Sequence, residues 1–99
     1  MFSEEKLNKI FDKTDGRCRF CGKQLSWSNY GQRGRRGAWA VDHSIPPANG
    51  GSDHLNNLYA TCYACNEEKS NTRGSSYKAK LRRQGRHVAR RGWWSGEYR

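Results

Sequence analysis

Two Cys-x-x-Cys pairs, Cys18/Cys21 and Cys62/Cys65, constrain the fold of this chain more than any other feature. Each pair can place two thiolates on one turn, and two such turns complete the tetrahedron of sulfur ligands that structural zinc prefers. The forty residues between the pairs must therefore bring the chain back to its starting point. Four cysteines leave no open coordination position, so the sequence predicts a structural zinc ion rather than a catalytic one.

The apolar content is too low for a conventional hydrophobic core. Only twelve of the 99 residues are Leu, Ile, Val or Phe, and the net charge is +10, so a cross-link must stabilise the fold. Disulfides are the alternative to zinc, but no apolar run typical of a secretory signal follows Met1, and no stretch has membrane-spanning length. We therefore expect a cytoplasmic protein without membrane contacts, since cysteine pairs there bind metal more often than each other.

Local patterns predict a small α+β fold. Ser3 is expected to cap a helix that ends near Gly16. Short strands are predicted over residues 39–42 and 55–61, and together they form a hairpin with a long connection that prolines and glycines interrupt.

The second half of the chain is predicted to be helical. A short helix is expected over 66–73, then a Gly-Ser-Ser hinge, and then a basic helix over 77–91. The expected division is a zinc-stabilised domain at 1–74 and a basic aromatic C-terminal extension at 75–99.

Positive charge is concentrated near the C-terminus. Residues 73–99 hold nine Lys or Arg against one acidic residue, a net charge of +8, which indicates a polyanionic partner, nucleic acid above all. A solvated charged surface is the simpler alternative, and Trp93 and Trp94 could equally stack on bases or pack on the core. The side chains expected to contact DNA are Arg33, Arg35, Arg36, Lys69, Arg73, Arg82, Arg83, Arg86, Arg90 and Arg91.

Three polar residues suit phosphodiester hydrolysis. A neutral histidine such as His43 can deprotonate water near physiological pH. Asp42 and Asn66 offer oxygen ligands, which favour Mg²⁺ or Mn²⁺ over softer metals. An isolated Asp-His pair is more often only part of a polar loop, and neighbours on a regular strand point to opposite faces.

Several spaced motifs together resemble the HNH nuclease family over residues 18–72. The resemblance implies a ββα-metal fold in which a hairpin and a helix enclose one metal ion. It implies that His43 is the general base, that Asp42 and Asn66 hold the catalytic metal at the bent end of a strand, and that Asn57 braces the loop that orients His43. Many relatives have histidine where this chain has Asn66. The matching motifs are Val41-Asp42-His43-Ser44-Ile45-Pro46, Gly50-Gly51, Asn57-Leu58 and Cys62-x-x-Cys65-Asn66-x-x-Lys69.

The expected function is that of a metal-dependent HNH endonuclease from a bacterium or a phage-infected host. It would cleave DNA to give a 3′-hydroxyl and a 5′-phosphate, nicking as a monomer or cutting both strands as a homodimer. RNA suits the same chemistry. The alternatives are a non-catalytic zinc module that binds nucleic acid, and an accessory nuclease subunit of a larger phage or mobile-element assembly.

Overall fold

A computed structural model describes residues 2–89 of the chain, so Arg90, Arg91, Trp93 and Trp94 lie outside the described residues. None of the described helices is both long enough and apolar enough to cross a membrane. The helices and strands are α1 (Glu4–Lys13), β1 (Trp39–His43), β2 (Leu58–Cys62), α2 (Tyr63–Lys69) and α3 (Gly74–Arg83), with short 3₁₀ turns η1 (Trp27–Asn29), η2 (Pro47–Asn49) and η3 (Leu55–Asn57).

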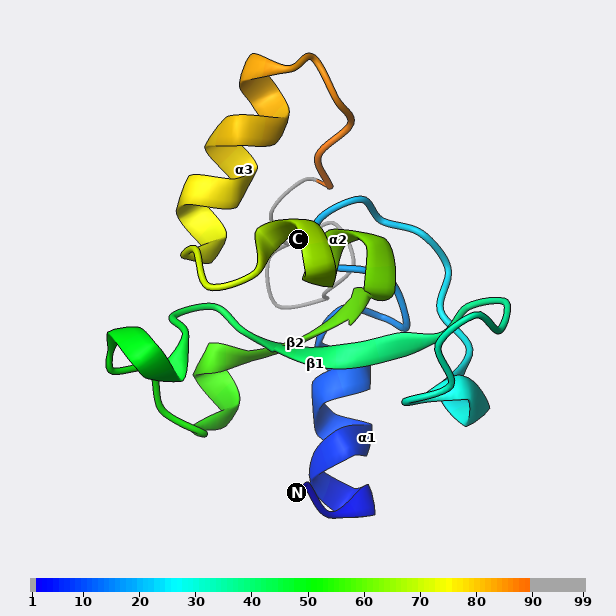
Figure 1. The fold of residues 1–99 in the computed structure, drawn as a ribbon. Coiled ribbons are helices and arrows are strands. Elements are labelled where there is room, and N and C mark those ends of the chain that lie inside the picture. Colours follow the sequence, from blue (N-terminus) through cyan, green and yellow to red (C-terminus); the bar gives the residue numbers. More distant parts are fainter. Residues whose placement is uncertain (1, 90–99) are drawn as a thin grey trace.

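A two-stranded antiparallel hairpin forms the centre of the fold. β1 pairs with β2 so that Trp39 lies opposite Cys62 and His43 lies opposite Leu58. Helix α2 covers one face of the hairpin and α1 covers the other, while α3 stands beyond α2 (Figure 1). This is the small α+β arrangement of hairpin and helix that the sequence predicts, and the ββα-metal fold class is confirmed.

Helix α1 begins as predicted, because the Ser3 hydroxyl accepts a hydrogen bond from the Lys6 amide at 3.1 Å. Its apolar stripe buries Leu7 and Ile10. Two lysines on the helix bind the loop before β2: Lys6 Nζ donates to the Asp53 carbonyl, and Lys13 Nζ donates to two further carbonyls at 2.5 and 2.7 Å. Helix α1 therefore fixes the loop that follows β1 as well as covering the core.

Aromatic side chains provide much of the buried apolar surface. Trp39 is fully buried and contacts the rings of Phe11 and Tyr30. On the other side of the hairpin, Phe20 and Tyr77 meet edge to face, with 4.8 Å between their ring centroids. Because Tyr77 belongs to α3, this helix packs on the same core as the rest of the domain.

The predicted bounds of three elements, β2, α2 and α3, were wrong. Strand β2 begins at Leu58 rather than residue 55, because residues 55–57 form the turn η3, in which the Asn57 side chain is bound to the preceding loop. Helix α2 begins at Tyr63, inside the second cysteine pair, and ends at Lys69.

The predicted hinge at 74–76 is the first turn of a helix, and α3 covers 74–83 rather than 77–91. Gly74 is buried there, and its amide donates to the Ser44 carbonyl at 2.8 Å. This tertiary contact holds the segment in a helix although its composition is typical of a loop.

Glu68 on α2 holds α3 and the segment after it. Its carboxylate accepts hydrogen bonds from the Tyr77 hydroxyl at 2.6 Å and from Arg86 at 2.7 and 2.9 Å. The Arg86 and Tyr77 donors lower the pKa of Glu68 to about 2. A carboxylate with a lowered folded-state pKa stabilises the fold above its usual pKa and loses that contribution as the pH falls through the folded value.

We therefore expect Glu68→Gln to lower the melting temperature at pH 7, with the difference from wild type shrinking as the pH falls from about 4.5 towards 2. Thermal unfolding followed by circular dichroism measures it. Glu67→Gln is the matched control, since the ion-pair partner of Glu67 among residues 2–89 is the exposed Arg33. An equal destabilisation by both variants at every pH would contradict this role for Glu68.

Candidate metal centre and active site

The four cysteines converge on one point. The sulfur atoms of Cys18, Cys21, Cys62 and Cys65 lie within 4.8 Å of one another, and all four cysteines are free. Contacts with the other three sulfurs lower the pKa of the Cys62 thiol. The segments that carry the two pairs are adjacent in space because the Arg19 amide donates to the Ala60 carbonyl of β2 at 3.1 Å.

This sulfur cluster fits a tetrahedral zinc ion. A zinc–sulfur bond of about 2.3 Å places ligand sulfurs about 3.8 Å apart in a regular tetrahedron, and Cys21 and Cys62 are separated by 3.9 Å. The cluster also begins α2, since Cys62 Sγ accepts a hydrogen bond from the Cys65 amide at 3.5 Å. Asn66 follows Cys65 directly, so the same cluster positions the helix that carries Asn66.

A pocket of about 150 Å³ lies between β1 and α2, and Asp42, His43, Asn66 and Lys69 are among the residues that line it. The structure therefore brings the three residues expected to perform hydrolysis to one pocket. The Asn66 side chain makes a long hydrogen bond to the Thr61 hydroxyl, at 3.4 Å.

Asp42 is 5% exposed, and only one of its two carboxylate oxygens has a partner among residues 2–89. Its Oδ1 lies 3.0 Å from Lys69 Nζ, whereas Oδ2 is buried with no hydrogen-bond partner among residues 2–89. Burial raises the pKa of Asp42, although Lys69 and Arg19 act in the opposite direction. An unsatisfied buried carboxylate oxygen is costly unless a cation or a donor meets it, so this oxygen suits a hard metal ion.

Lys69 faces inward. It was expected to contact DNA, but its side chain is 1% exposed and donates to the His43 carbonyl at 3.0 Å in addition to pairing with Asp42. Its ammonium group therefore fixes the end of β1 and the orientation of the Asp42 carboxylate.

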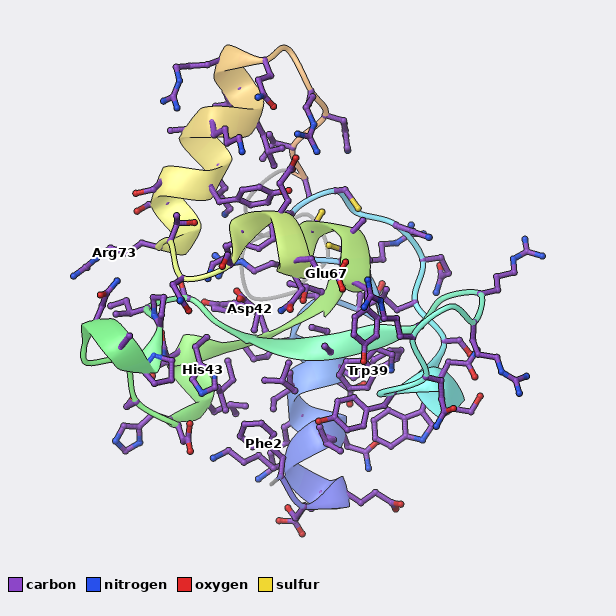
Figure 2. The ribbon with its side chains drawn as sticks, viewed as in Figure 1. Phe2, Trp39, Asp42, His43, Glu67 and Arg73 are labelled. Atoms are coloured by element: carbon purple, nitrogen blue, oxygen red, sulfur yellow. The ribbon has the colours of Figure 1, made fainter. Side chains whose placement is uncertain are left out.

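His43 and Asp42 reach the site from opposite sides of β1. Figure 2 shows Asp42 on the side of α2, and His43 on the side of Phe2, whose ring centroid is 6.3 Å from that of His43. His43 Nε2 lies 2.7 Å from Asp53 Oδ1, and this hydrogen bond lowers the pKa of Asp53. An ionised carboxylate can only accept, so Nε2 carries the proton and Nδ1 of the neutral ring keeps its lone pair.

Asp53 was missed in the sequence. It stands in a polar loop ten residues after His43, and nothing in the local pattern distinguishes it from a solvated loop carboxylate. Only the path of the loop, which α1 holds, brings it to the histidine.

Asn57 holds the loop after His43 closed. Its Oδ1 accepts from the Ile45 amide at 2.9 Å, and its Nδ2 donates to the carbonyls of Ile45 and Ser52 at 3.1 and 2.8 Å. Gly51 is required in the same loop, because a Cβ there would lie 1.6 Å from the Ile45 carbonyl oxygen. The loop is therefore compact on both sides of the segment that carries Asp53.

Two of the remaining arginines that were expected to contact DNA are paired with glutamates. Arg33 pairs with Glu67 at 2.6 Å and Arg86 pairs with Glu68 at 2.7 Å. Arg73 projects outward at the start of α3 (Figure 2). Of the others expected to contact DNA, Arg35, Arg36, Arg82 and Arg83 are exposed.

Comparison with family models finds a match over residues 18–72 to the family described as HNH endonuclease. A search of curated proteins finds no match. The matched segment begins at the first cysteine of the sulfur cluster and includes both strands, α2 and the pocket that Asp42, His43 and Asn66 line.

Proposed function

The chain belongs to the HNH endonuclease family, and we propose that it is a metal-dependent endonuclease that hydrolyses phosphodiester bonds in DNA. Family membership supports a nuclease in general. One observation carries the finer proposal: a buried carboxylate oxygen, Asp42 Oδ2, has no partner among the described residues and belongs to a pocket that His43 and Asn66 also line.

Asp42 and Asn66 are the residues that would hold the catalytic ion. Their donor atoms are oxygens, which suit Mg²⁺ or Mn²⁺. The bound ion would neutralise charge at the scissile phosphate and stabilise the leaving oxygen. Lys69 keeps the Asp42 carboxylate in a fixed orientation by binding Oδ1 and leaving Oδ2 for the ion.

His43 is the proposed general base. Its Nε2–H donates to Asp53, so Nδ1 is the atom that would take a proton from the attacking water. Asn57 would keep this geometry by closing the loop between His43 and Asp53. His43 and Asp42 lie on opposite sides of β1 (Figure 2), so the proposal requires the imidazole ring to turn towards the Asp42 side when substrate binds.

DNA is the proposed substrate because exposed arginines occur on the loop after η1 and on α3. The first group precedes the pocket residues in the sequence and the second group follows them. Arginine contacts to phosphate give affinity that does not depend on sequence and that falls with salt. The proposed products are a 3′-hydroxyl and a 5′-phosphate. A single site per chain would nick as a monomer and cut both strands as a homodimer.

Variants of the proposed metal ligands test this function. We expect Asn66→Ala and Asp42→Asn each to raise the Mn²⁺ concentration that gives half-maximal cleavage by roughly tenfold or more. Asn71→Ala is the matched control, because Asn71 lines the same pocket without a proposed ligand role. Cleavage is measured across a Mn²⁺ titration, and folding is checked by circular dichroism. Wild-type curves for all three variants would contradict the assignment of Asp42 and Asn66 as metal ligands.

Asp53 is a positioning residue in this proposal. We expect Asp53→Asn to lower kcat roughly tenfold while KM stays within about twofold, since the amide no longer holds the Nε2–H tautomer. Asp53→Glu should restore part of the rate, and Asp12→Asn, at an exposed carboxylate on α1, should change nothing. Steady-state kinetics on an oligonucleotide measures this, and an unchanged kcat in Asp53→Asn would remove Asp53 from the mechanism.

A further inference from the structure

A second pocket, of about 310 Å³, lies just beyond the end of β1. Its lining consists of Arg19, Ser44, Ile45, Arg73, Gly74, Ser75 and Lys78. Ser44 directly follows His43, so this pocket begins where the active-site strand ends. Three of these side chains are cationic, and none of the described residues that line the pocket is acidic. Its composition suits an anion.

Arg19 is the central feature of this pocket. Its side chain is only 8% exposed, and its Nε and Nη1 are buried without a hydrogen-bond partner among residues 2–89. The guanidinium lies 3.8 Å above the Tyr59 ring, which holds its plane but accepts none of its in-plane N–H groups. A buried donor set left unsatisfied is rare in a folded protein, and arginine keeps its charge there, so an anionic acceptor is the natural partner.

The N-terminus of α3 faces the same pocket. Gly74 donates its amide to the Ser44 carbonyl, whereas the amides of Ser75 and Ser76 have no acceptor among residues 2–89. Such amides and the helix dipole together favour an anion. The space depends on glycine: a Cβ at Gly74 would lie 2.9 Å from Ser44 Oγ and 3.1 Å from Arg19 Nη1.

We propose that this pocket binds a phosphate group of the nucleic acid backbone. That group would be a phosphate close to the phosphate that is cleaved. Arg19 and the first turn of α3 are its main donors, with Arg73 and Lys78 adding charge at the rim. The nucleic acid source of the phosphate rests on the proposed function, while the phosphate chemistry rests on the pocket itself. A free phosphate ion or mononucleotide offers the same chemistry and is the competing source.

The test uses two charge-matched variants. Ser75 lines the pocket and the adjacent Ser76 does not, and both are exposed in the first turn of α3, where a carboxylate favours the helix. Binding of a short duplex is measured by fluorescence anisotropy at several salt concentrations, without Mg²⁺ or Mn²⁺. We expect Ser75→Glu to weaken binding roughly tenfold more than Ser76→Glu, and to reduce the salt slope by about one.

Arg19→Gln supplies an independent variant, with folding checked by circular dichroism. It should reproduce the Ser75→Glu loss of roughly tenfold. Equal affinities of Ser75→Glu and Ser76→Glu would overturn the proposal, whatever Arg19→Gln does.

Inorganic phosphate distinguishes the two sources. Phosphate is titrated into ¹⁵N-labelled protein at constant ionic strength, and the amide signals of Gly74 and Ser75 are followed by NMR. Saturable shifts that a duplex oligonucleotide reverses by competition support a backbone-phosphate site. Shifts without such competition indicate a free-phosphate site and overturn the proposal. None of these tests measures cleavage, so the two proposals can fail separately. If the protein passes these binding tests but cleaves no DNA, the proposed function is wrong and the phosphate site still stands.

Discussion

Replacing Cys65 with serine is expected to unfold the domain, release zinc and abolish cleavage. Structural zinc in small domains contributes roughly 10–16 kcal/mol to folding, and a whole domain is stable by only about 5–15 kcal/mol. Twelve Leu, Ile, Val or Phe residues cannot offset that loss. The chemistry itself is untouched, because the catalytic loss follows from disordering Asn66, the next residue in α2.

Cys65→His is the matched control for this prediction. A Cys₃His site still gives zinc four ligands of the correct kind, so this variant should bind zinc, fold and keep part of its activity. Zinc content and far-ultraviolet circular dichroism distinguish the zinc-bound, folded protein from the zinc-free, unfolded one. A cleavage assay is run in parallel. Cleavage by a zinc-free and unfolded Cys65→Ser protein would contradict the proposed link between the sulfur cluster and the active site.

His43→Ala is expected to lower the rate of cleavage by a factor of roughly 10² to 10⁴, the range that a positioned general base contributes. The variant should fold, because His43 is only partly buried and its main side-chain contact is the exposed Asp53. DNA affinity in the absence of Mg²⁺ or Mn²⁺ should stay within about twofold of wild type, since exposed arginines supply it.

His54→Ala controls for the loss of an imidazole from the same loop. His54 is exposed, and its side chain makes no hydrogen bond or ion pair with residues 2–89, so the rate should not change. Single-turnover cleavage separates the chemical step from binding. A folded His43→Ala protein that cleaves at the wild-type rate would show that another group is the base.

The features that the sequence predicts correctly depend on local rules. The cysteine spacing predicts one sulfur cluster, since each pair needs only one turn to present two ligands. Ser3 caps α1 through a bond three residues away. The alternation of Trp39 and Val41 with Ala40 and Asp42 indicates strand β1. A second strand paired with it is expected because the chain must bring the second cysteine pair back to the first.

The features that the sequence does not reveal depend on tertiary contacts. Gly74 looks like part of a hinge but lies in a helix, because Ser44 and Arg19 pack against it. Lys69 resembles a DNA contact in a basic chain, yet it is buried against Asp42. Asp53 and Arg19 acquire their roles only when loops distant in sequence are placed around β1.

Cleavage of a supercoiled plasmid by purified, zinc-loaded protein tests the central proposal most directly. The protein is incubated with Mg²⁺ or Mn²⁺ and, in parallel, without either ion. We expect nicked or linear plasmid only when one of these ions is present. Binding of the plasmid without cleavage, with every divalent metal tried, would contradict the proposal and would identify the chain as a zinc module that binds nucleic acid or a subunit that requires a partner.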